Sequence, residues 1–307
     1  MTGSEEPRQV CALVTAYQPD GRLAAVVESA LTSCAAVIVA DNTPGDRPSM
    51  ADKLDDPRVT VLRSGHNLGL AAALNLGLGA LPPNAWAVLL LDQDSVLPPG
   101  TVPGLLAHLQ RDETVGVVGP GPVDAEGGGQ YETLAKLHAE VAERYSIITS
   151  GMLVRRSCLD ALPAPVFRED FFVDCVDLDF CFKIRRAGLR VLCDQGLPLP
   201  HSIGEGRDHR VLGRTVRVLH YPAWRHYWIA RNGMVLTRER GLHERAFALI
   251  NLLFMTRWLI VTAAFEPKRR SHVPAVLRGL RDGLAGRVDL AYLPPGAEYR
   301  GRPGHGG

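Results

Sequence analysis

Two acidic residues, Asp92 and Asp94, stand between the apolar run 87–91 and the sequence Pro98-Pro99-Gly100. In a strand, residues i and i+2 point to the same side, so both carboxylates can be aimed at one point. Two such charges repel unless a cation lies between them, and Mg²⁺ is commonly held by one or two carboxylates together with substrate phosphates. The pattern predicts a divalent-cation site, and a solvated acidic turn is the alternative.

Asp177 is the second acid with a chemical interpretation, because it opens a helical pattern after the apolar stretch "FFVDCV". A carboxylate in a partly dry cleft can take a proton from a hydroxyl group, which typically accelerates a reaction ~10²–10⁴-fold. The alternative is an acid of the first helical turn, which stabilises a helix by about 1 kcal/mol. The spacing leaves both interpretations of Asp177 open. We expect only local roles for Asp174, an acid of a loop, and for Asp179, a charge in the first turn of the helix.

His201 follows "DQGLPLP" at the end of the last strand-like segment of the first two thirds of the chain. A lone histidine is usually structural. An imidazole that joins two carboxylates around one cation is nevertheless chemically reasonable.

The elements that must position these residues alternate between apolar strands and amphipathic helices. Strands are expected at 10–17, 36–42, 59–64 and 86–94, and helices at 22–34 and 68–81. Apolar runs separated by helices indicate a mostly parallel sheet in an α/β domain. Ligands bind at the carboxyl ends of such strands, and the residues at those ends are polar: Thr15, Asp41, Arg63 and Asp92.

The second half of the chain is less regular. A strand is expected at 115–123, a second at 145–156 broken at Ser150 and Gly151, a helix within 171–188 and a strand at 190–194. From residue 211 the pattern becomes helical and rich in arginine. We therefore expect a disordered N-terminus (1–9), an α/β domain (10–210), a C-terminal helical region (211–293) and a disordered tail (294–307).

Composition narrows the function classes. With 307 residues, 46% hydrophobic, the chain can bury a sizeable core, and a net charge of +1 does not suggest a nucleic-acid binder. The six cysteines form no C-x-x-C pair, which is typical of reduced, mostly buried thiols in a cytoplasmic protein. The polar, acidic start "MTGSEEPRQV" does not resemble a signal peptide.

The ordered set of motifs resembles family 2 inverting glycosyltransferases of the GT-A type, and most of all their rhamnosyltransferase-like branch. The motifs span about residues 10–235 and are "VTAYQPDGRL", "ADNTPG", "SGHNLGLAAALNLGL", "LLLDQDS", "TSGMLV", "FFVDCVDLDFCFKIRRAGLRV" and "LPHSIGE". The resemblance implies a Rossmann-like, mostly parallel central sheet flanked by helices, followed by a C-terminal helical extension.

The resemblance also implies roles for individual residues. Asp177 matches the catalytic base, and Asp92, Asp94 and His201 would hold Mg²⁺ or Mn²⁺. The nucleotide-sugar would be bound by residues of several motifs: Thr15, Tyr17, Asp41, Asn67, Asn75, Asp92, Gln93, Ser150, Gly151 and Arg231. Val176 stands where other family members carry a glutamate before the base, so the acceptor contacts of that glutamate are in doubt.

The implied activity is a hexosyltransferase that uses a nucleotide-sugar donor. A dTDP-6-deoxyhexose such as dTDP-L-rhamnose is the first choice of donor, and UDP-galactofuranose is the second. The acceptor is left open among a glycan, a lipid-linked glycan and a small molecule. Two other classes remain as alternatives: a nucleotidyltransferase, although "TAYQPDGRL" lacks the Gly-rich basic loop that such an enzyme needs, and a non-catalytic nucleotide-sugar-binding module.

The segment 246–265 has the length of a membrane span, but Arg257 lies near its middle. Because a basic stretch follows and the sequence suggests no second span, we expect a buried or surface-docking helix, with a true membrane span as the alternative. Basic residues flank it on both sides, which suits a helix lying on the inner face of an anionic membrane. The alternative is a helical pair that packs on the α/β domain or forms a homodimer, with its arginines in solvent.

Overall fold

The computed structural model describes residues 9–124, 140–201, 206–211 and 214–301. The described chain divides into two compact units. Unit 1 consists of the described parts of Met1–Arg168 and Asp177–Ser202, and unit 2 consists of Glu169–Val176 and the described parts of Ile203–Gly307. The sequence predicts one boundary near residue 210, whereas the short stretch Glu169–Val176 also belongs with the C-terminal unit.

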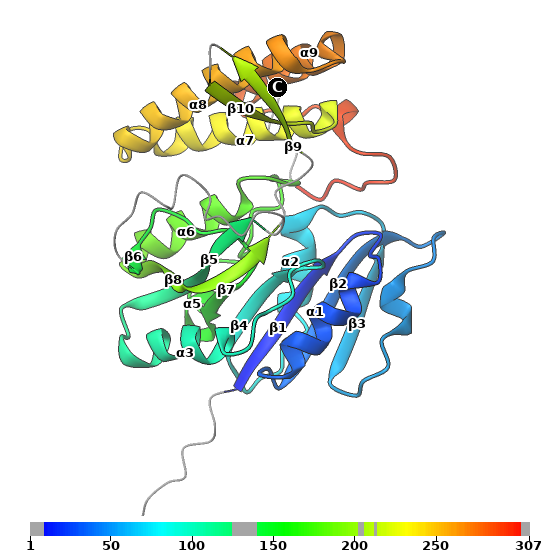
Figure 1. Ribbon diagram of the computed structural model, residues 1–307, viewed down its shortest axis with the longest axis vertical. Helices are drawn as coiled ribbons and strands as arrows, with labels where there is room; N and C mark the ends of the chain where they lie inside the picture. Colours follow the sequence, from blue (N-terminus) through cyan, green and yellow to red (C-terminus); the bar gives the residue numbers. More distant parts are fainter. Residues whose placement is uncertain (1–8, 125–139, 202–205, 212–213, 302–307) are drawn as a thin grey trace, which may run out of the picture. The chain divides into compact units, whose positions relative to one another are not determined.

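Unit 1 is built on an eight-stranded sheet in the order β3-β2-β1-β4-β7-β5-β8-β6 (Figure 1). β1 (Gln9–Ala16), β2 (Ala36–Pro44), β3 (Val59–Gly65) and β4 (Ala85–Asp92) are parallel. β5 (Val115–Asp124) is parallel to β8 (Arg190–His201), whereas β7 (Met152–Arg155) and β6 (Val141–Glu143) run antiparallel to their neighbours. The expected mostly parallel sheet is confirmed, and its central strands are buried on both faces.

Helices cover both faces of this sheet. α1 (Arg22–Leu31) and α3 (Thr101–Arg111) pack on one face, where their apolar residues join a single core with β1, β2 and β4. The other helices of unit 1 are α2 (Leu70–Leu78), α5 (Arg156–Asp160) and α6 (Val176–Arg186). The short 3-10 helix η1 (Met50–Lys53) begins at Ser49, whose side chain accepts a hydrogen bond from the Ala51 amide. All six cysteines are free, and five of them are buried.

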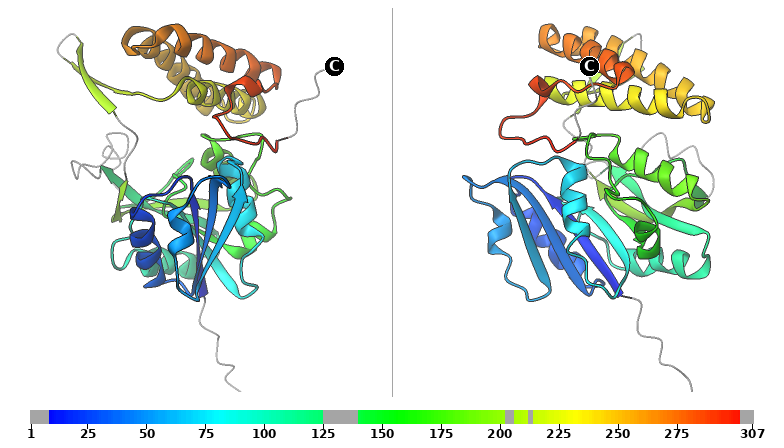
Figure 2. Two further views of the ribbon diagram at one scale, coloured as in Figure 1. Left: turned by 90° about the vertical axis from the view of Figure 1, so that its right-hand side faces the viewer. Right: turned by 180° about the vertical axis from the view of Figure 1, so that it is seen from behind.

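Unit 2 contains a two-stranded antiparallel hairpin, β9 (Gly206–Val211) and β10 (Arg214–Leu219), and three helices. The helices are α7 (Ala223–Arg240), α8 (Arg245–Phe265) and α9 (Arg269–Ala285), which pack on one another (Figure 2). Gly279 of α9 allows a close approach, because a Cβ atom there would lie 2.4 Å from the Tyr227 carbonyl oxygen of α7. The sequence predicts helix from residue 211, so the strand β10 differs from that expectation.

The C-terminal segment after α9 also differs from its expectation. The 3-10 helix η2 (Leu290–Tyr292) places Tyr292 against Tyr227, with ring centroids 4.4 Å apart and nearly parallel planes. Farther on, the ring of Tyr299 lies 5.9 Å from that of Trp228. Residues 294–301 therefore pack on α7 instead of forming a disordered tail. Residues 302–307, like residues 1–8 of the expected disordered N-terminus, lie outside the described residues, whereas Gln9 is the first residue of β1.

Candidate active site

Asp92, Asp94 and His201 come together at the carboxyl edge of the sheet in unit 1. One potential ligand atom from each residue lies within 4.8 Å of the other two, and all three residues are half-buried. Opposite ligands of an octahedral Mg²⁺ ion are about 4.2 Å apart, since each metal–oxygen bond is about 2.1 Å. The two carboxylates and the imidazole therefore fit one hard divalent cation, and their partial exposure leaves room for further oxygen ligands.

The reason why the two carboxylates converge differs from the one that the sequence suggests. β4 ends at Asp92, and Asp94 lies in a turn that is closed by a hydrogen bond from the Ser95 amide to the Asp92 carbonyl oxygen (3.3 Å). The alternation of side chains along a strand therefore does not apply to this pair. The turn carries Asp94 back beside Asp92.

His201 is suited to act as a neutral ligand. Burial lowers the pKa of its imidazole below the usual 6.5, and the nearby Asp94 carboxylate opposes that shift only in part. Its Nδ1 lies 3.3 Å from the hydroxyl oxygen of Ser95, a residue with no exposed surface. Metal binding by histidine requires the neutral imidazole, which is the favoured form here at neutral pH.

Two residues that the sequence analysis did not single out adjoin this cluster. Ser95 orients His201, and it is the last residue of the quoted motif "LLLDQDS", so its position next to Asp94 was the available signal. Arg22 at the start of α1 has its Nη1 atom 3.7 Å from Asp94 Oδ2. Arg22 also pairs with Asp20, and nothing in its sequence context distinguishes it from an ordinary surface arginine.

The end of β1 is tied to the same place. Thr15 pairs in register with Asp92 of β4, and the following residue of β1 pairs with Asp41 of β2. The amide of Tyr17, a residue that is 38% exposed, donates a hydrogen bond to Gln93 Oε1 (2.7 Å). Four of the predicted nucleotide-binding positions, Thr15, Tyr17, Asp41 and Gln93, therefore share one edge of the sheet with the acids.

Asp41 is the most deeply buried of these side chains. Its Oδ1 accepts a hydrogen bond from the Thr43 amide (2.9 Å), and its Oδ2 lies 3.5 Å from Nε of Arg63. Oδ2 accepts no hydrogen bond from the described residues and is buried. Because an unmet buried acceptor costs free energy, this oxygen is a candidate partner for an N–H or O–H group of a ligand.

Ser150 and Gly151 precede β7 and contact the end of β4. The Ser150 hydroxyl oxygen accepts a hydrogen bond from the Asp92 amide (3.3 Å), and the Gly151 amide donates to the Leu90 carbonyl oxygen (2.8 Å). Gly151 has a φ of +82°, and a Cβ atom there would lie 2.6 Å from the Pro120 ring. The pair thus fixes the backbone that carries Asp92, and only glycine fits its second position without strain.

Asn67 and Asn75 occupy different surroundings. Asn67 follows β3, and its Oδ1 accepts a hydrogen bond from the Gly69 amide (3.0 Å) just before α2 begins. Asn75, within α2, donates to the Phe167 carbonyl oxygen (2.8 Å) and accepts from the Phe167 amide (2.9 Å). The structure therefore places Asn75 against the Phe167 backbone and does not bring it together with the acids.

Asp177 lies in the first turn of α6, where its Oδ1 accepts a hydrogen bond from the Leu178 amide (2.8 Å). The other end of α6 packs where β5 and β8 begin, because Ile184 and Leu189 adjoin Gly116 of β5. The first turn of α6 is therefore directed toward the carboxyl ends of those strands, as a residue of the site must be. The neighbouring Asp179 is buried and pairs with Lys183 (3.0 Å), which agrees with a local role.

Arg231 belongs to unit 2, and its guanidinium group is occupied by protein partners. Nε donates to the Arg287 carbonyl oxygen (3.1 Å), Nη1 to the Asp170 carbonyl oxygen (2.8 Å), and Nη2 to the Asp170 carboxylate (3.1 Å). The side chain is 3% exposed. The structure thus gives Arg231 a role in holding the backbone of unit 2 together, and its assignment to the nucleotide-sugar stays a prediction.

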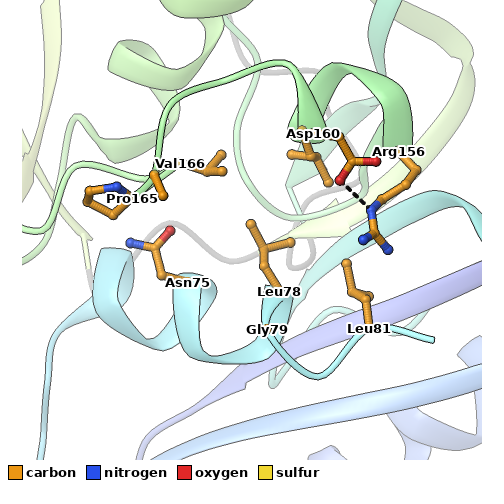
Figure 3. A pocket seen from close by; sticks show the side chains of 10 residues that line it. Asn75, Leu78, Gly79, Leu81, Arg156, Asp160, Pro165 and Val166 are labelled. Atoms are coloured by element: carbon orange, nitrogen blue, oxygen red, sulfur yellow. Dashed lines mark hydrogen bonds and ion pairs between the residues drawn. The ribbon is translucent and has the colours of Figure 1, made fainter. Parts of the chain in front are cut away.

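A cavity of about 510 Å³ lies elsewhere in unit 1 and is not part of this cluster (Figure 3). It is lined by residues of α2, α5 and the segment 164–166, including an ion pair between Arg156 and Asp160 (2.8 Å). Nη1 of Arg156 donates to the Pro82 carbonyl oxygen, just before β4 begins. The cavity therefore lies toward the opposite end of β4 from Asp92, away from the cluster of Asp92, Asp94 and His201.

Comparison with known proteins points to one family of glycosyltransferases. Residues 11–158 match the sequence profile of glycosyl transferase family 2. The chain is 25% identical over 299 residues to the dTDP-rhamnosyl transferase RfbF of Shigella flexneri, a match that covers 90% of this chain and 97% of that protein.

Two solved structures are similar in fold. The mannosyltransferase PcManGT from Pyrobaculum calidifontis, in complex with GDP-Man and Mn²⁺, matches with a TM-score of 0.56 and 17% identity and covers 93% of this chain and 89% of that one. GalNAc-T7 with UDP, GalNAc and Mn²⁺ matches with a TM-score of 0.50 and 13% identity, over 86% and 59% of the two chains. Together with the sheet topology, these likenesses show a GT-A-type fold, and the sequence profile shows a glycosyl transferase family 2 domain at residues 11–158 of a chain that resembles a rhamnosyltransferase.

Proposed function

We propose that this glycosyltransferase transfers L-rhamnose or another 6-deoxyhexose from a dTDP-sugar to an acceptor hydroxyl group, with inversion at C1. The observation that carries the proposal is the convergence of Asp92, Asp94 and His201 at the carboxyl edge of the sheet. The 25% identity to a dTDP-rhamnosyl transferase over nearly its whole length supports the choice of donor. UDP-galactofuranose remains the second candidate donor.

A divalent cation, Mg²⁺ or Mn²⁺, held by Asp92, Asp94 and His201 would neutralise charge on the departing diphosphate. Around it, the chain supplies the remaining functions. We assign Thr15, Tyr17 and Asp41 to the base and ribose, with the unsatisfied Oδ2 of Asp41 accepting a hydrogen bond from the nucleoside. Gln93 and Ser150 hold the backbone that presents the two acids, because each accepts a hydrogen bond from a main-chain amide at this edge.

In the transfer itself, Asp177 takes the proton from the acceptor hydroxyl group as that oxygen attacks C1 of the sugar. The bond between C1 and the phosphate oxygen breaks, and dTDP leaves with the bonding electrons. A single displacement of this kind inverts the configuration at C1. The position of Asp177 in the first turn of α6, directed toward the carboxyl edge, supports this role.

The donor assignment is tested by nucleotide release from a panel of donors with Mn²⁺ or with a chelator. The panel contains dTDP-L-rhamnose, UDP-galactofuranose, GDP-mannose and UDP-GalNAc. We expect the fastest metal-dependent release of nucleotide from the dTDP-sugar. A clear preference for a GDP-sugar, or equal release after removal of the metal, would contradict the proposal.

We propose the cytoplasm as the location of the protein, in agreement with its six free thiols.

A further inference from the structure

The outward side of α8 is apolar where a surface helix normally carries polar residues. Leu249, Leu253 and Ile260 are 61%, 62% and 61% exposed, and their spacing of four and seven residues puts them on one side of the helix. Exposed apolar neighbours widen this stripe: Ile250, Leu252 and Phe254. We call these six residues the α8 stripe.

The opposite side of α8 is fixed to α7. Nδ2 of Asn251 donates hydrogen bonds to the Gly233 carbonyl oxygen (2.9 Å) and to the Thr237 hydroxyl oxygen (2.7 Å). Eleven residues later, the hydroxyl oxygen of Thr262 lies 3.5 Å from Nδ1 of His226. α8 is therefore held to α7 through buried polar contacts along most of its length.

These contacts decide how α8 can meet a membrane. By length and composition alone it could cross one, and only 17% of its most apolar window is buried. A crossing would carry α7 into the lipid together with its buried arginines Arg231 and Arg240, or would break the polar contacts between the two helices. Ionised side chains are costly inside a bilayer. A helix that lies in the plane of the surface avoids that cost and keeps α7 outside.

The exposed charged residues of α8 and of the start of α9 are all basic. α8 contains no acidic residue, and its two arginines, Arg245 and Arg257, are exposed. Lys268, Arg269 and Arg270, at the start of α9, are exposed as well. A surface that combines a wide apolar stripe with basic residues matches the boundary between lipid headgroups and acyl chains in an anionic leaflet.

We propose that the α8 stripe docks unit 2 onto an anionic membrane surface, with α8 in the plane of the bilayer and the basic residues at the lipid phosphates. A second copy of this chain fits the surface less well. A two-fold contact across the stripe would bring the two copies of Arg257 together, because Arg257 lies near the middle of α8. The docking rests on unit 2 alone and does not depend on the proposed glycosyl transfer.

The test is co-sedimentation of the full chain with phosphatidylcholine vesicles that contain or lack phosphatidylglycerol. We expect binding to the anionic vesicles at low salt and weaker binding at high salt. Leu253→Glu should lower the partition coefficient at least ~10-fold, because it puts a charge into the apolar stripe. The matched control, Leu290→Glu, changes another exposed leucine of unit 2, which lies outside α8 (54% exposed, against 62% for Leu253), and should bind as the parent chain does.

A second pair of variants tests the electrostatic part. Arg269→Gln with Arg270→Gln should weaken binding to anionic vesicles roughly tenfold. Arg111→Gln with Arg186→Gln has the same net charge but changes two exposed arginines of unit 1, and it should leave binding unchanged. Thermal unfolding and nucleotide release, measured on the same samples, separate a docking defect from misfolding and from a failure of the proposed activity.

Three results would overturn the proposal. The first is a chain that stays in the supernatant with anionic vesicles at low salt. The second is a Leu253→Glu variant that binds the vesicles as tightly as the parent chain. The third is a dimer, seen by light scattering, that the Leu253→Glu substitution dissociates while neither the parent chain nor the variant binds vesicles. That result would assign the α8 stripe to self-association.

Discussion

The carboxyl edge of the sheet in unit 1 and the surroundings of Arg231 in unit 2 hold buried polar groups in opposite ways. In unit 1, Asp41 keeps a carboxylate oxygen that accepts no hydrogen bond from the described residues, and Asp92 and Asp94 bring two like charges together beside His201. In unit 2, the polar atoms of Arg231 are satisfied by Asp170, Asn232 and Arg287.

The difference distinguishes polar groups that are available to bind a ligand from polar groups that stabilise the fold. Unmet acceptors and adjacent like charges cost stability, so a protein keeps them where a ligand or cation will pair with them. Satisfied networks contribute to the fold and have little capacity left for a ligand. On this criterion the edge of unit 1 is the candidate binding site, and the network around Arg231 stabilises the fold of unit 2.

The strongest test of this contrast is Asp177→Asn. An amide cannot act as the base, so we expect turnover to fall ~10²–10⁴-fold while affinity for the donor nucleotide is kept. Turnover is measured with the best donor and a saturating acceptor, and affinity by calorimetry. Asp179→Asn, which changes an acid of the same helical turn that pairs with Lys183, is a control for the local charge of α6. Near-normal turnover in Asp177→Asn would remove the assignment of the base.

Arg231→Met probes the structural side of the comparison. The substitution removes the hydrogen bonds that Arg231 donates to the Asp170 carboxylate and to two carbonyl oxygens, and we expect a loss of about 3 kcal/mol in the free energy of unfolding of unit 2. Nucleotide binding at temperatures where the variant is folded should stay unchanged. A stable variant with weakened nucleotide binding would instead support the role that the family resemblance implies for Arg231.

His226 offers a pH-dependent test of unit 2. Burial, followed by the neighbours His272 and His220, lowers the pKa of His226 to about 4. Below pH 6.5 the unfolded chain binds a proton that folded His226 does not, so stability falls as the pH drops from about 6.5 toward 4. The loss is on the order of 2–3 kcal/mol.

The melting temperature as a function of pH measures this effect. His226→Gln should flatten the acid side of the curve, whereas His243→Gln, which changes an exposed histidine, should leave it as in the parent chain. An unchanged slope in His226→Gln would show that another group controls acid stability.

The smallest of these effects is expected for Asp41→Asn. If Oδ2 of Asp41 accepts a hydrogen bond from the nucleoside, its replacement should weaken dTDP binding about tenfold. Asp52 is the matched control, because it is exposed and pairs with the same Arg63 (2.8 Å). Equal affinities of Asp41→Asn and Asp52→Asn would show that Asp41 only orients Arg63.

The first half of the fold could be predicted from the sequence because its signals are local. Apolar runs end at polar residues such as Thr15 and Asp41, and helical spacing lies between them, so strand order and the binding edge follow from general rules of α/β sheets. The cluster of Asp92, Asp94 and His201 was also predictable, although Asp94 reaches it through a turn and not along a strand.

The features of the structure that could not be predicted from the sequence depend on contacts between residues far apart in the chain. The sequence of β10 lies in the region that is predicted to be an arginine-rich helix. Its strand conformation is determined by its pairing with β9 and not by its own composition. Likewise, the family resemblance assigns Arg231 to the nucleotide-sugar, and its structural role becomes visible only in its hydrogen bonds to Asp170 and Arg287. The exposure of α8 depends on which side packs against α7, which apolar content alone does not reveal.

The central claim is that the carboxyl edge of unit 1 binds the donor nucleotide through a divalent cation. Calorimetric titration of dTDP, with Mn²⁺ or with a chelator, tests it most directly on three chains: the parent, Asp94→Asn and Asp160→Asn. We predict that Mn²⁺ raises dTDP affinity at least ~10-fold in the parent and in Asp160→Asn, which changes an exposed acid toward the other end of the sheet, but not in Asp94→Asn. Equal dTDP affinity with and without Mn²⁺ in the parent chain, or an unchanged Mn²⁺ effect in Asp94→Asn, would contradict the claim.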